Sequence, residues 1–321
     1  MSDSEKTLSD QVQPFLIEDL GLRGRLVRLG RSVDEIAGRG RYPAPVAELL
    51  AEFLAFTVVL GNALKFEGIF KAQAQGDGPV GFLVADMTHD GNLRGYARFD
   101  AGHVEAIGDV DSAPVPRLLG AGRLAVTVDQ GPSRQQYQGI TELTGASLSD
   151  CAHAYFRQSE PVETAISLAA GLNGQTVHAS ALMIQRVAHD GGQPGSEEDE
   201  HERDYDDEWR RAVVLTSSVT PTELLNPALE SSSLLYRLYH EDGVRLFRVR
   251  DIRHSCRCSQ ERVAATLSSF PSEEIDSMVE DGRITVTCGV LPVQVFFRGE
   301  VPYCSLPILM GARTRAKLPR L

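Results

Sequence analysis

The sequence predicts an α+β fold in three parts: an N-terminal mixed α/β domain with antiparallel-rich sheets over residues 1–188, an acidic loop and helical linker over residues 189–243, and a small C-terminal domain over residues 244–321. Strand patterns occur in runs with inserted helix patterns rather than in strict alternation, which favours an α+β class. Acidic residues crowd positions 197–208, and four of the five cysteines follow residue 255. These two changes of composition indicate the acidic loop that begins the linker and the separate C-terminal domain.

Eight stretches of the first domain have the period-two alternation or the residue content typical of strands. The stretch from Leu22 to Leu29 alternates apolar and basic residues, as a half-buried strand does. Asp90 and Gly91 stand between two strand patterns and predict a hairpin turn. The expected strands cover residues 22–29, 65–75, 82–86, 93–99, 123–129, 135–143, 163–168 and 179–187.

Two short helices are expected in the same domain. Ser32, followed three positions later by Glu35, has the spacing of a capping box and predicts a helix start. Residues 148–158 have a helical pattern and contain Cys151. Because unpaired cysteine is among the most buried residue types, Cys151 is interpreted as a small buried hydrophobe rather than a reactive thiol.

The most apolar segment of the chain, residues 45–64, predicts a long helix. It follows Pro43 and begins with Pro45, and the first helical turn is where proline is tolerated. Glu48 and Glu52 interrupt the apolar run one helical turn apart. The segment is therefore expected to be an amphipathic buried helix rather than a membrane span.

After residue 188 the composition changes abruptly. Residues 189–208 combine glycines with a run of acidic residues that repels itself and cannot bury a core, so an acidic loop is expected. Helix patterns follow at 209–218, 221–229 and 234–240, and Thr220 with Glu223 has capping-box spacing. The apolar stripe of residues 234–240 is either ordinary core or a surface covered in one state and exposed in another.

Charge and the N-terminal sequence limit the classes of partner. The net charge of −12 argues against nucleic-acid binding, which needs a basic surface. The first forty residues contain no apolar run of the kind that a secretory signal requires. We therefore expect a cytoplasmic protein with neither nucleic acid nor membrane as a partner.

Cysteine spacing is the most specific chemical signal. Cys256 and Cys258 are separated by one residue, and Cys288 and Cys304 follow. In a protein that is not exported, clustered thiols indicate metal binding or redox chemistry rather than structural disulfides. Zinc prefers four such ligands in a tetrahedron. His254 is a further candidate ligand, although an exposed histidine at a strand end is the simpler interpretation.

Enzyme motifs are absent from the sequence: it has no Walker loop, dinucleotide fingerprint, nucleophile elbow or His-Glu-X-X-His pair. No catalytic residue is therefore assigned, and a non-enzymatic protein is expected. A zinc-dependent hydrolase with an open fourth coordination position is the weaker alternative, with Glu261 as the nearest possible general base.

Several motifs in one order resemble a known family. The C-terminal ones are His-Ser-Cys-Arg-Cys-Ser-Gln-Glu-Arg at 254–262, Phe-Pro-Ser-Glu-Glu-Ile-Asp-Ser-Met at 270–278 and Gly-Arg-Ile-Thr-Val-Thr-Cys at 282–288. Earlier ones include Gln-Gly-Asp-Gly-Pro at 75–79 and Leu-Tyr-Arg-Leu-Tyr-His-Glu at 235–241. Together they resemble the bacterial 33 kDa heat-shock chaperone family, Hsp33, over roughly residues 12–288.

This resemblance implies a redox-regulated, ATP-independent holdase whose C-terminal domain is a zinc-binding redox switch. In the family, four cysteines hold one Zn²⁺ in the reduced state, and oxidation forms disulfides, releases zinc and exposes apolar surface to unfolding client proteins. The oxidised protein is expected to be a homodimer. Carried over, Cys256, Cys258 and Cys288 are the first three zinc ligands and the redox-active thiols.

Position 291, where the resemblance requires the fourth cysteine, is Leu291. Gly-Val-Leu-Pro can be encoded GGA-GTT-CTG-CCN, and a reading shifted by one base gives Glu-Phe-Cys. A shifted reading frame after Cys288 is therefore one hypothesis. If the sequence stands, either Cys304 supplies the fourth zinc ligand or three thiolates hold the ion more weakly. A protein whose switch is damaged and unregulated is the alternative function.

Overall fold

The computed structural model describes most of the chain. The described residues are 7–38, 42–64, 66–108, 110, 112–130, 136–159, 162–174, 176–186, 205–255, 265, 267–279, 283–287, 292–297 and 302–305.

The chain forms two compact units that divide after His254. This differs from the predicted boundaries at residues 188 and 243, because the linker and residues 244–254 belong to the first unit. The reason is strand pairing over long sequence separations. β10 (Val244–Leu246) and β11 (Arg250–Asp251) pair with the N-terminal strand β1, and β12 (Arg253–His254) pairs with β5.

The first sheet of this unit is antiparallel, with the strand order β10-β1-β2-β9-β8 and β11 also on β1. Residues 22–29 were predicted as a strand and form β2, with alternate side chains turned to opposite faces. The strand before it has no counterpart among the expected strands. The bounds are β1 Gln11–Ile17, β2 Leu22–Leu29, β8 Thr164–Asn173 and β9 Thr176–Arg186.

The second sheet has the order β12-β5-β4-β3-β6-β7, and all its pairs are antiparallel except β12 with β5. The predicted hairpin around Asp90 and Gly91 joins β4 to β5, and Gly91 has the positive φ of 86° that such a turn requires. The mixed α/β class with antiparallel-rich sheets is confirmed. The bounds are β3 Ile69–Gly76, β4 Val80–Thr88, β5 Asn92–Phe99, β6 Gly122–Asp129 and β7 Tyr137–Glu142.

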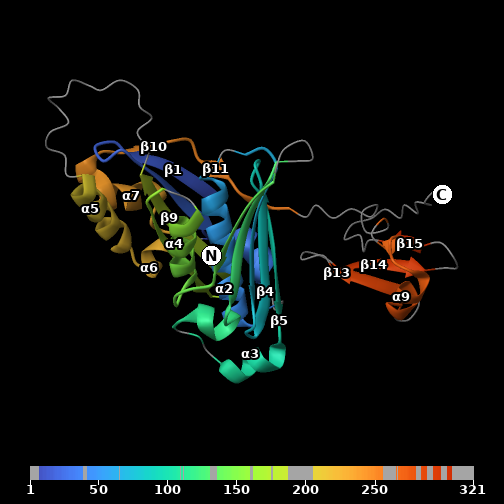
Figure 1. Cartoon of the computed structure of the whole chain (residues 1–321). Helices are drawn as coiled ribbons and strands as arrows, with labels where there is room; N and C mark the ends of the chain where they lie inside the picture. Colours follow the sequence, from blue (N-terminus) through green and yellow to red (C-terminus); the bar gives the residue numbers. More distant parts are fainter. Residues whose placement is uncertain are drawn as a thin grey trace, which may run out of the picture. The chain divides into compact units, whose positions relative to one another are not determined.

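Helix α2 (Ala44–Gly61) lies between the two sheets (Figure 1) and contacts strands of both. It is long and apolar enough to cross a membrane by length and composition, but 78% of it is buried inside the protein. The predicted buried helix is confirmed. It is not amphipathic in the usual sense, because sheets cover it on opposite sides and only a narrow strip, with Glu48 and Glu52, is partly exposed.

Helix α1 (Arg31–Ala37) exists as predicted but its start was assigned wrongly. The N-cap residue is Gly30, and no side chain of the helix itself caps it. Instead the carboxylate of Asp10 accepts hydrogen bonds from the backbone N–H groups of Gly30 and Ser32, at 2.9 and 3.0 Å. A capping group twenty residues away cannot be found by local spacing.

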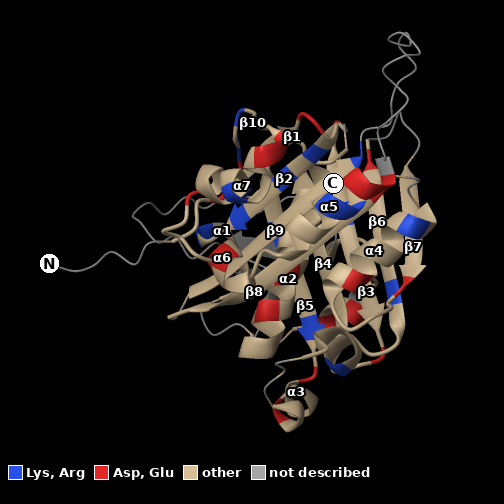
Figure 2. Ribbon diagram, turned by 90° about the vertical axis from the view of Figure 1, so that its left-hand side faces the viewer, with Lys and Arg blue, Asp and Glu red and all other residues tan. Residues whose placement is uncertain are grey.

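Among the remaining helices of the first unit, α4 contacts β8 of the first sheet and β7 of the second, whereas α5 and α6 contact β8 and β9 of the first sheet. The predicted helix at 148–158 is α4, whereas the one predicted at 221–229 ends early, at Leu224. Figure 2 shows that Lys and Arg positions are interspersed with Asp and Glu positions along these elements. The bounds are α3 Ala101–Ile107, a π-helix Val115–Leu119, α4 Leu148–Ser159, α5 Tyr205–Ser217, α6 Pro221–Leu224, α7 Ser231–Tyr239 and a 3-10 turn His240–Asp242.

The second unit contains a helix, α9 (Ser272–Ser277), and an antiparallel sheet of β13 (Arg283–Thr287), β14 (Pro292–Phe297) and β15 (Pro302–Ser305). Most of the acidic loop predicted at 189–208 lies outside the described residues.

Candidate functional site

One face of the first sheet is apolar and is covered by the linker helices α5, α6 and α7, on the side away from α2 (Figure 1). Strand alternation produces this face, because every second residue of each strand points to it while the others pack toward α2. Its members are at most 5% exposed. They are Phe15, Ile17, Leu22, Leu26, Ala165, Ala169, Leu182 and Ile184.

Gly24 allows the largest side chain of this face to lie flat on the sheet. Gly24 pairs with Phe15 across β1 and β2. A Cβ atom at Gly24 would lie 1.9 Å from the ring of Phe15. The ring of Phe15 therefore occupies the space above β2 and provides a broad apolar surface that the linker covers.

The linker contributes a matching apolar stripe. On α7, Leu234, Leu235, Leu238 and Tyr239 are at most 5% exposed, and their spacing of one and four residues places them on one side of the helix. Leu224 of α6 is also buried against the sheet, whereas Leu215 and Leu225 are only partly buried. The stripe predicted at residues 234–240 is therefore covered in this structure.

Two buried hydroxyl groups join the linker helices α5 and α7. Thr216 of α5 donates to the carbonyl of Ala212 at 2.7 Å, and its Oγ1 lies 2.7 Å from the Tyr239 hydroxyl of α7. Because the single Thr216 proton is used by Ala212, Tyr239 is the donor between them. The ring of Tyr239 stacks on Phe15, with centroids 5.7 Å apart. Tyr239 thus connects α5, α7 and the sheet.

Charged groups fix the ends of the linker. Thr220 and Glu223 form the predicted capping box on α6, and Glu223 also pairs with Arg237 of α7 at 2.7 Å. Arg211 of α5 pairs with Asp242 at 3.1 Å. The Asp242 carboxyl is 5% exposed, and its burial raises its pKa. Such a buried carboxylate depends on its arginine.

Arg28 was missed by the sequence reasoning. It lies on the linker-covered face and donates to the backbone carbonyls of Glu223 in α6 and of Asn226 and Leu229 in the loop between α6 and α7. A signal was present: Arg23 and Arg25 occupy one phase of the strand alternation, whereas Arg28 shares the phase of Leu22 and Leu26. An arginine on the apolar face of a strand is unusual, because charged side chains are rarely buried without partners. Its position in the alternation therefore predicts a buried binding partner.

The predicted zinc ligands Cys256, Cys258 and Cys288, together with Leu291, lie outside the described residues. Cys304 lies on β15 and pairs with Val295 of β14, which pairs with Ile284 of β13. This register separates Cys304 from Thr287, the residue before Cys288, by three steps along a strand and two strands across. The backbone positions of Cys304 and Thr287 are therefore roughly 14 Å apart. Because Cys288 lies outside the described residues, the assignment of Cys304 as the fourth ligand stays a prediction.

Soft thiol donors suit zinc, and the zinc site with Cys256, Cys258, Cys288 and Cys304 as candidate ligands stays a prediction from the sequence. Within the part of the chain that the structure describes, no cluster of three or more His, Cys, Asp or Glu side chains forms another metal site.

His254 corrects a prediction. The sequence places it at a strand end, which β12 confirms, but the side chain is only 6% exposed rather than exposed. Its Nδ1 lies 3.3 Å from Glu35 Oε2 of α1. The parallel pairing of β12 with β5 carries His254 against α1, a contact between residues 219 positions apart.

Cys151 is buried, as predicted. Its thiol donates to the Thr144 carbonyl at 3.2 Å, and burial raises its pKa to about 11. It therefore remains a protonated thiol at neutral pH, when reactive cysteines need the thiolate form.

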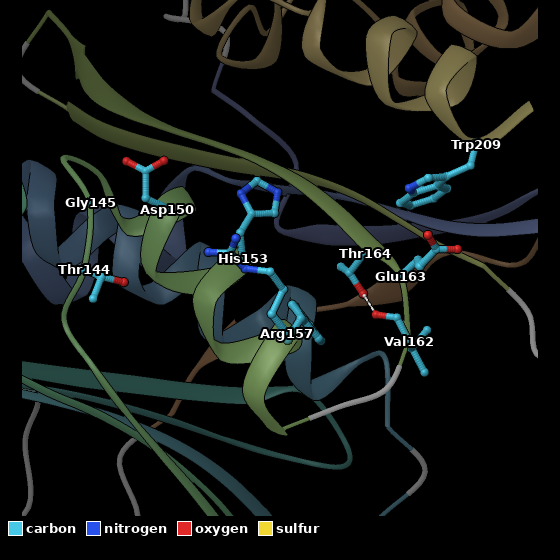
Figure 3. A pocket seen from close by; sticks show the side chains of 10 residues that line it. Thr144, Gly145, Asp150, His153, Arg157, Val162, Glu163, Thr164 and Trp209 are labelled. Carbon is cyan, nitrogen blue, oxygen red and sulfur yellow. Dashed lines mark hydrogen bonds between the residues drawn. The ribbon is translucent and has the colours of Figure 1, made fainter. Parts of the chain in front are cut away.

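A cavity of about 880 Å³ lies beside α4, β8 and the start of α5 (Figure 3). Two of its polar groups, Asp150 and His153, make structural hydrogen bonds. Asp150 accepts hydrogen bonds from the Ala146 and Ser147 N–H groups at 2.9 Å, and His153 Nε2 accepts one from Ile166 N at 3.2 Å. His153 is thus a neutral imidazole, and burial lowers its pKa. These contacts stabilise the start of α4 and its packing on β8.

Comparison with known proteins agrees with this architecture. The family model described as Hsp33 protein matches residues 10–290. The 33 kDa chaperonin of Caulobacter vibrioides is 42% identical over 287 residues, covering 88% of this chain and 92% of that protein. The 33 kDa chaperonin of Pseudomonas fluorescens is 36% identical over 282 residues, covering 87% and 88%.

A solved structure shows the same fold. The crystal structure of the 33 kDa chaperonin of Thermotoga maritima superposes with a TM-score of 0.73 at 19% identity, over 91% of this chain and 95% of that one. The sequence matches extend over most of the chain, and the family model covers nearly all of the first unit and the second unit as far as residue 290. The chain therefore belongs to the Hsp33 family of chaperones.

Proposed function

We propose that this chain is a redox-regulated, ATP-independent holdase that binds unfolding proteins after oxidation of its zinc-ligating cysteines. Membership of the Hsp33 family supports a chaperone function. The observation that carries the finer proposal is the apolar sheet face around Phe15, Leu26 and Leu182, which the linker helices cover. A holdase needs apolar surface that is hidden until stress, and this face meets that requirement.

The linker is suited to leave this face. Its helices are short: α6 has 4 residues and α7 has 9. Helices of this length are marginal alone in water and owe their stability to tertiary packing. Once the packing is lost, the linker unfolds and the sheet face becomes available to clients.

In the proposed switch, Cys256, Cys258 and Cys288 hold Zn²⁺ in the reduced state, and bound zinc supplies folding free energy to the second unit. Hydrogen peroxide takes two electrons from two thiols, forming one disulfide and two water molecules. The oxidised thiols no longer bind the metal, and the second unit loses stability. The chain passes directly from this unit to β12, β11, β10 and the linker, so loosening of these short strands exposes the linker next.

The proposed partners follow from the same surface. Unfolding client proteins bind the apolar face, and the oxidised protein forms a homodimer in the cytoplasm. The net charge of −12 keeps the complexes with clients in solution and disfavours nucleic acid as a partner. No membrane partner is proposed, because the apolar helix α2 is used in the core.

Light scattering of a heat-aggregating client, without ATP, tests the proposal. The reduced, zinc-loaded protein is expected to suppress aggregation weakly, and the peroxide-treated protein strongly. Lack of suppression in both states would rule out the holdase. Equal suppression in both states would instead support the second candidate, a chaperone with an unregulated switch. That candidate is favoured by one observation, Leu291 at the position where a fourth ligand is expected.

A further inference from the structure

Arg28 of β2 is a buried cation within the face that the linker covers. It is 3% exposed, and it lies on the same side of the strand as Leu22 and Leu26. Burying a guanidinium costs free energy unless hydrogen bonds and charges compensate for the lost water. What surrounds this group therefore determines how the linker is held.

The partners of Arg28 all belong to the linker backbone. Nη1 donates to the carbonyls of Asn226, at 3.3 Å, and of Leu229. Nη2 donates to the carbonyl of Glu223 at 3.2 Å. The acceptors are one carbonyl of α6, at Glu223, and two carbonyls of the loop that joins α6 to α7. One forked side chain of the sheet thus fixes the loop on which the position of both linker helices depends.

Compensation for the buried charge is incomplete. The acceptors are neutral carbonyls rather than carboxylates, and Nε has no hydrogen-bond partner among the described residues. Burial lowers the pKa of Arg28 to about 10. When the linker leaves, water replaces the carbonyls and solvates the charge. The cost of burying Arg28 is therefore present only while the linker is docked.

These two effects oppose each other in one residue. The fork of hydrogen bonds favours the docked loop, since bonds from charged donors contribute more than neutral ones. The desolvated charge favours release. We propose that Arg28 is a positioning residue that holds the linker in register while keeping its docking only marginally stable. The inference rests on the proposed function, since it concerns the release of the same linker.

Two substitutions separate the fork from the charge. Arg28→Lys keeps a buried cation but cannot reach three carbonyls, so linker opening is expected to increase tenfold or more. Arg28→Met removes both the bonds and the charge and keeps an apolar side chain, so opening is expected to stay within about threefold of wild type. Arg23→Lys and Arg23→Met are matched controls, because Arg23 is exposed on the same strand.

The readout is linker docking in the reduced, full-length protein without client. Trp209, the single tryptophan of the chain, is on α5 and lies 5.7 Å from the guanidinium of Arg186, so its fluorescence reports on undocking. Limited proteolysis within residues 205–239 gives a second measure. A urea unfolding curve followed by circular dichroism identifies any variant in which the sheets themselves no longer fold.

The order of the variants decides the outcome. More opening in Arg28→Lys than in Arg28→Met supports the proposal. More opening in Arg28→Met would mean that Arg28 only stabilises docking, with no opposing cost from its buried charge. Wild-type docking in both variants would mean that Arg28 only fills space. Either result overturns the proposal. Because no client is present, failure of the holdase assay would leave this result interpretable, and the two hypotheses fail separately.

Discussion

The hydroxyl of Tyr239 lies 2.7 Å from Oγ1 of Thr216, in a fully buried contact between the first and last helices of the linker. The same tyrosine ring stacks on Phe15 of the sheet. The hydrogen bond therefore links helix to helix at the point where both meet the apolar face. Its burial ties the fold of the linker to its docking, since undocking exposes both hydroxyl groups to water.

Tyr239→Phe is expected to destabilise linker docking by about 1 kcal/mol, because one buried hydrogen bond is lost while the ring and its stacking remain. Trp209 fluorescence during urea titration of the reduced protein measures the change. Tyr236→Phe is the control, since Tyr236 is on the same helix but 63% exposed. Equal shifts in both variants would show that the Thr216 contact contributes nothing specific.

Leu234→Ala is expected to release the linker without oxidation. Leu234 is fully buried against the sheet, and truncating a buried leucine costs about 2–5 kcal/mol. The apolar sheet face itself is unchanged, so the reduced variant should suppress client aggregation more than the reduced wild type. Leu172→Ala, at a position 51% exposed, is the control. A reduced Leu234→Ala protein that is destabilised in the linker yet inactive would contradict the assignment of this face to clients.

Glu52 is expected to make the first unit less stable as pH rises. Burial, and next the charge of Asp150, raise the pKa of Glu52 from 4.5 to about 7. Between these values the folded protein binds more protons than the unfolded chain, so stability falls with increasing pH, by at most about 3 kcal/mol in total. Glu52→Gln should flatten this slope between pH 4.5 and 7, whereas Glu105→Gln, on exposed α3, should not. Urea unfolding at several pH values measures how the free energy of unfolding depends on pH. An unchanged slope in Glu52→Gln would exclude this carboxyl as the cause of the pH dependence.

Cys304→Ser is expected to leave zinc binding nearly unchanged, because the register of β13, β14 and β15 places Cys304 far from the end of β13. Cys258→Ser should lose most of the zinc, since it removes one of the paired thiols. Zinc content of the reduced proteins, before and after a competing chelator, gives the comparison. Loss of zinc in Cys304→Ser equal to that in Cys258→Ser would restore Cys304 as the fourth ligand.

Local patterns predicted the elements whose signals are local. Period-two alternation located β2, β6 and the β4–β5 hairpin, and the capping box at Thr220 and Glu223 is formed as expected. The helix start at α1 was wrong because its cap comes from Asp10. β10 and β11 were missed because strands of two or three residues have no pattern of their own and exist only through pairing with β1.

The sequence by itself determined the family, the α+β class, the buried central helix and the spacing of the thiols, since motifs and short-range periodicity carry that information. Only the tertiary structure decided which faces meet. It placed Phe15 and Leu182 beneath Leu234 and Tyr239, turned His254 toward Glu35, and surrounded Arg28 with carbonyls some two hundred residues away. Burial and hydrogen-bond partners depend on contacts between distant segments, and a pattern of neighbouring residues cannot specify those contacts.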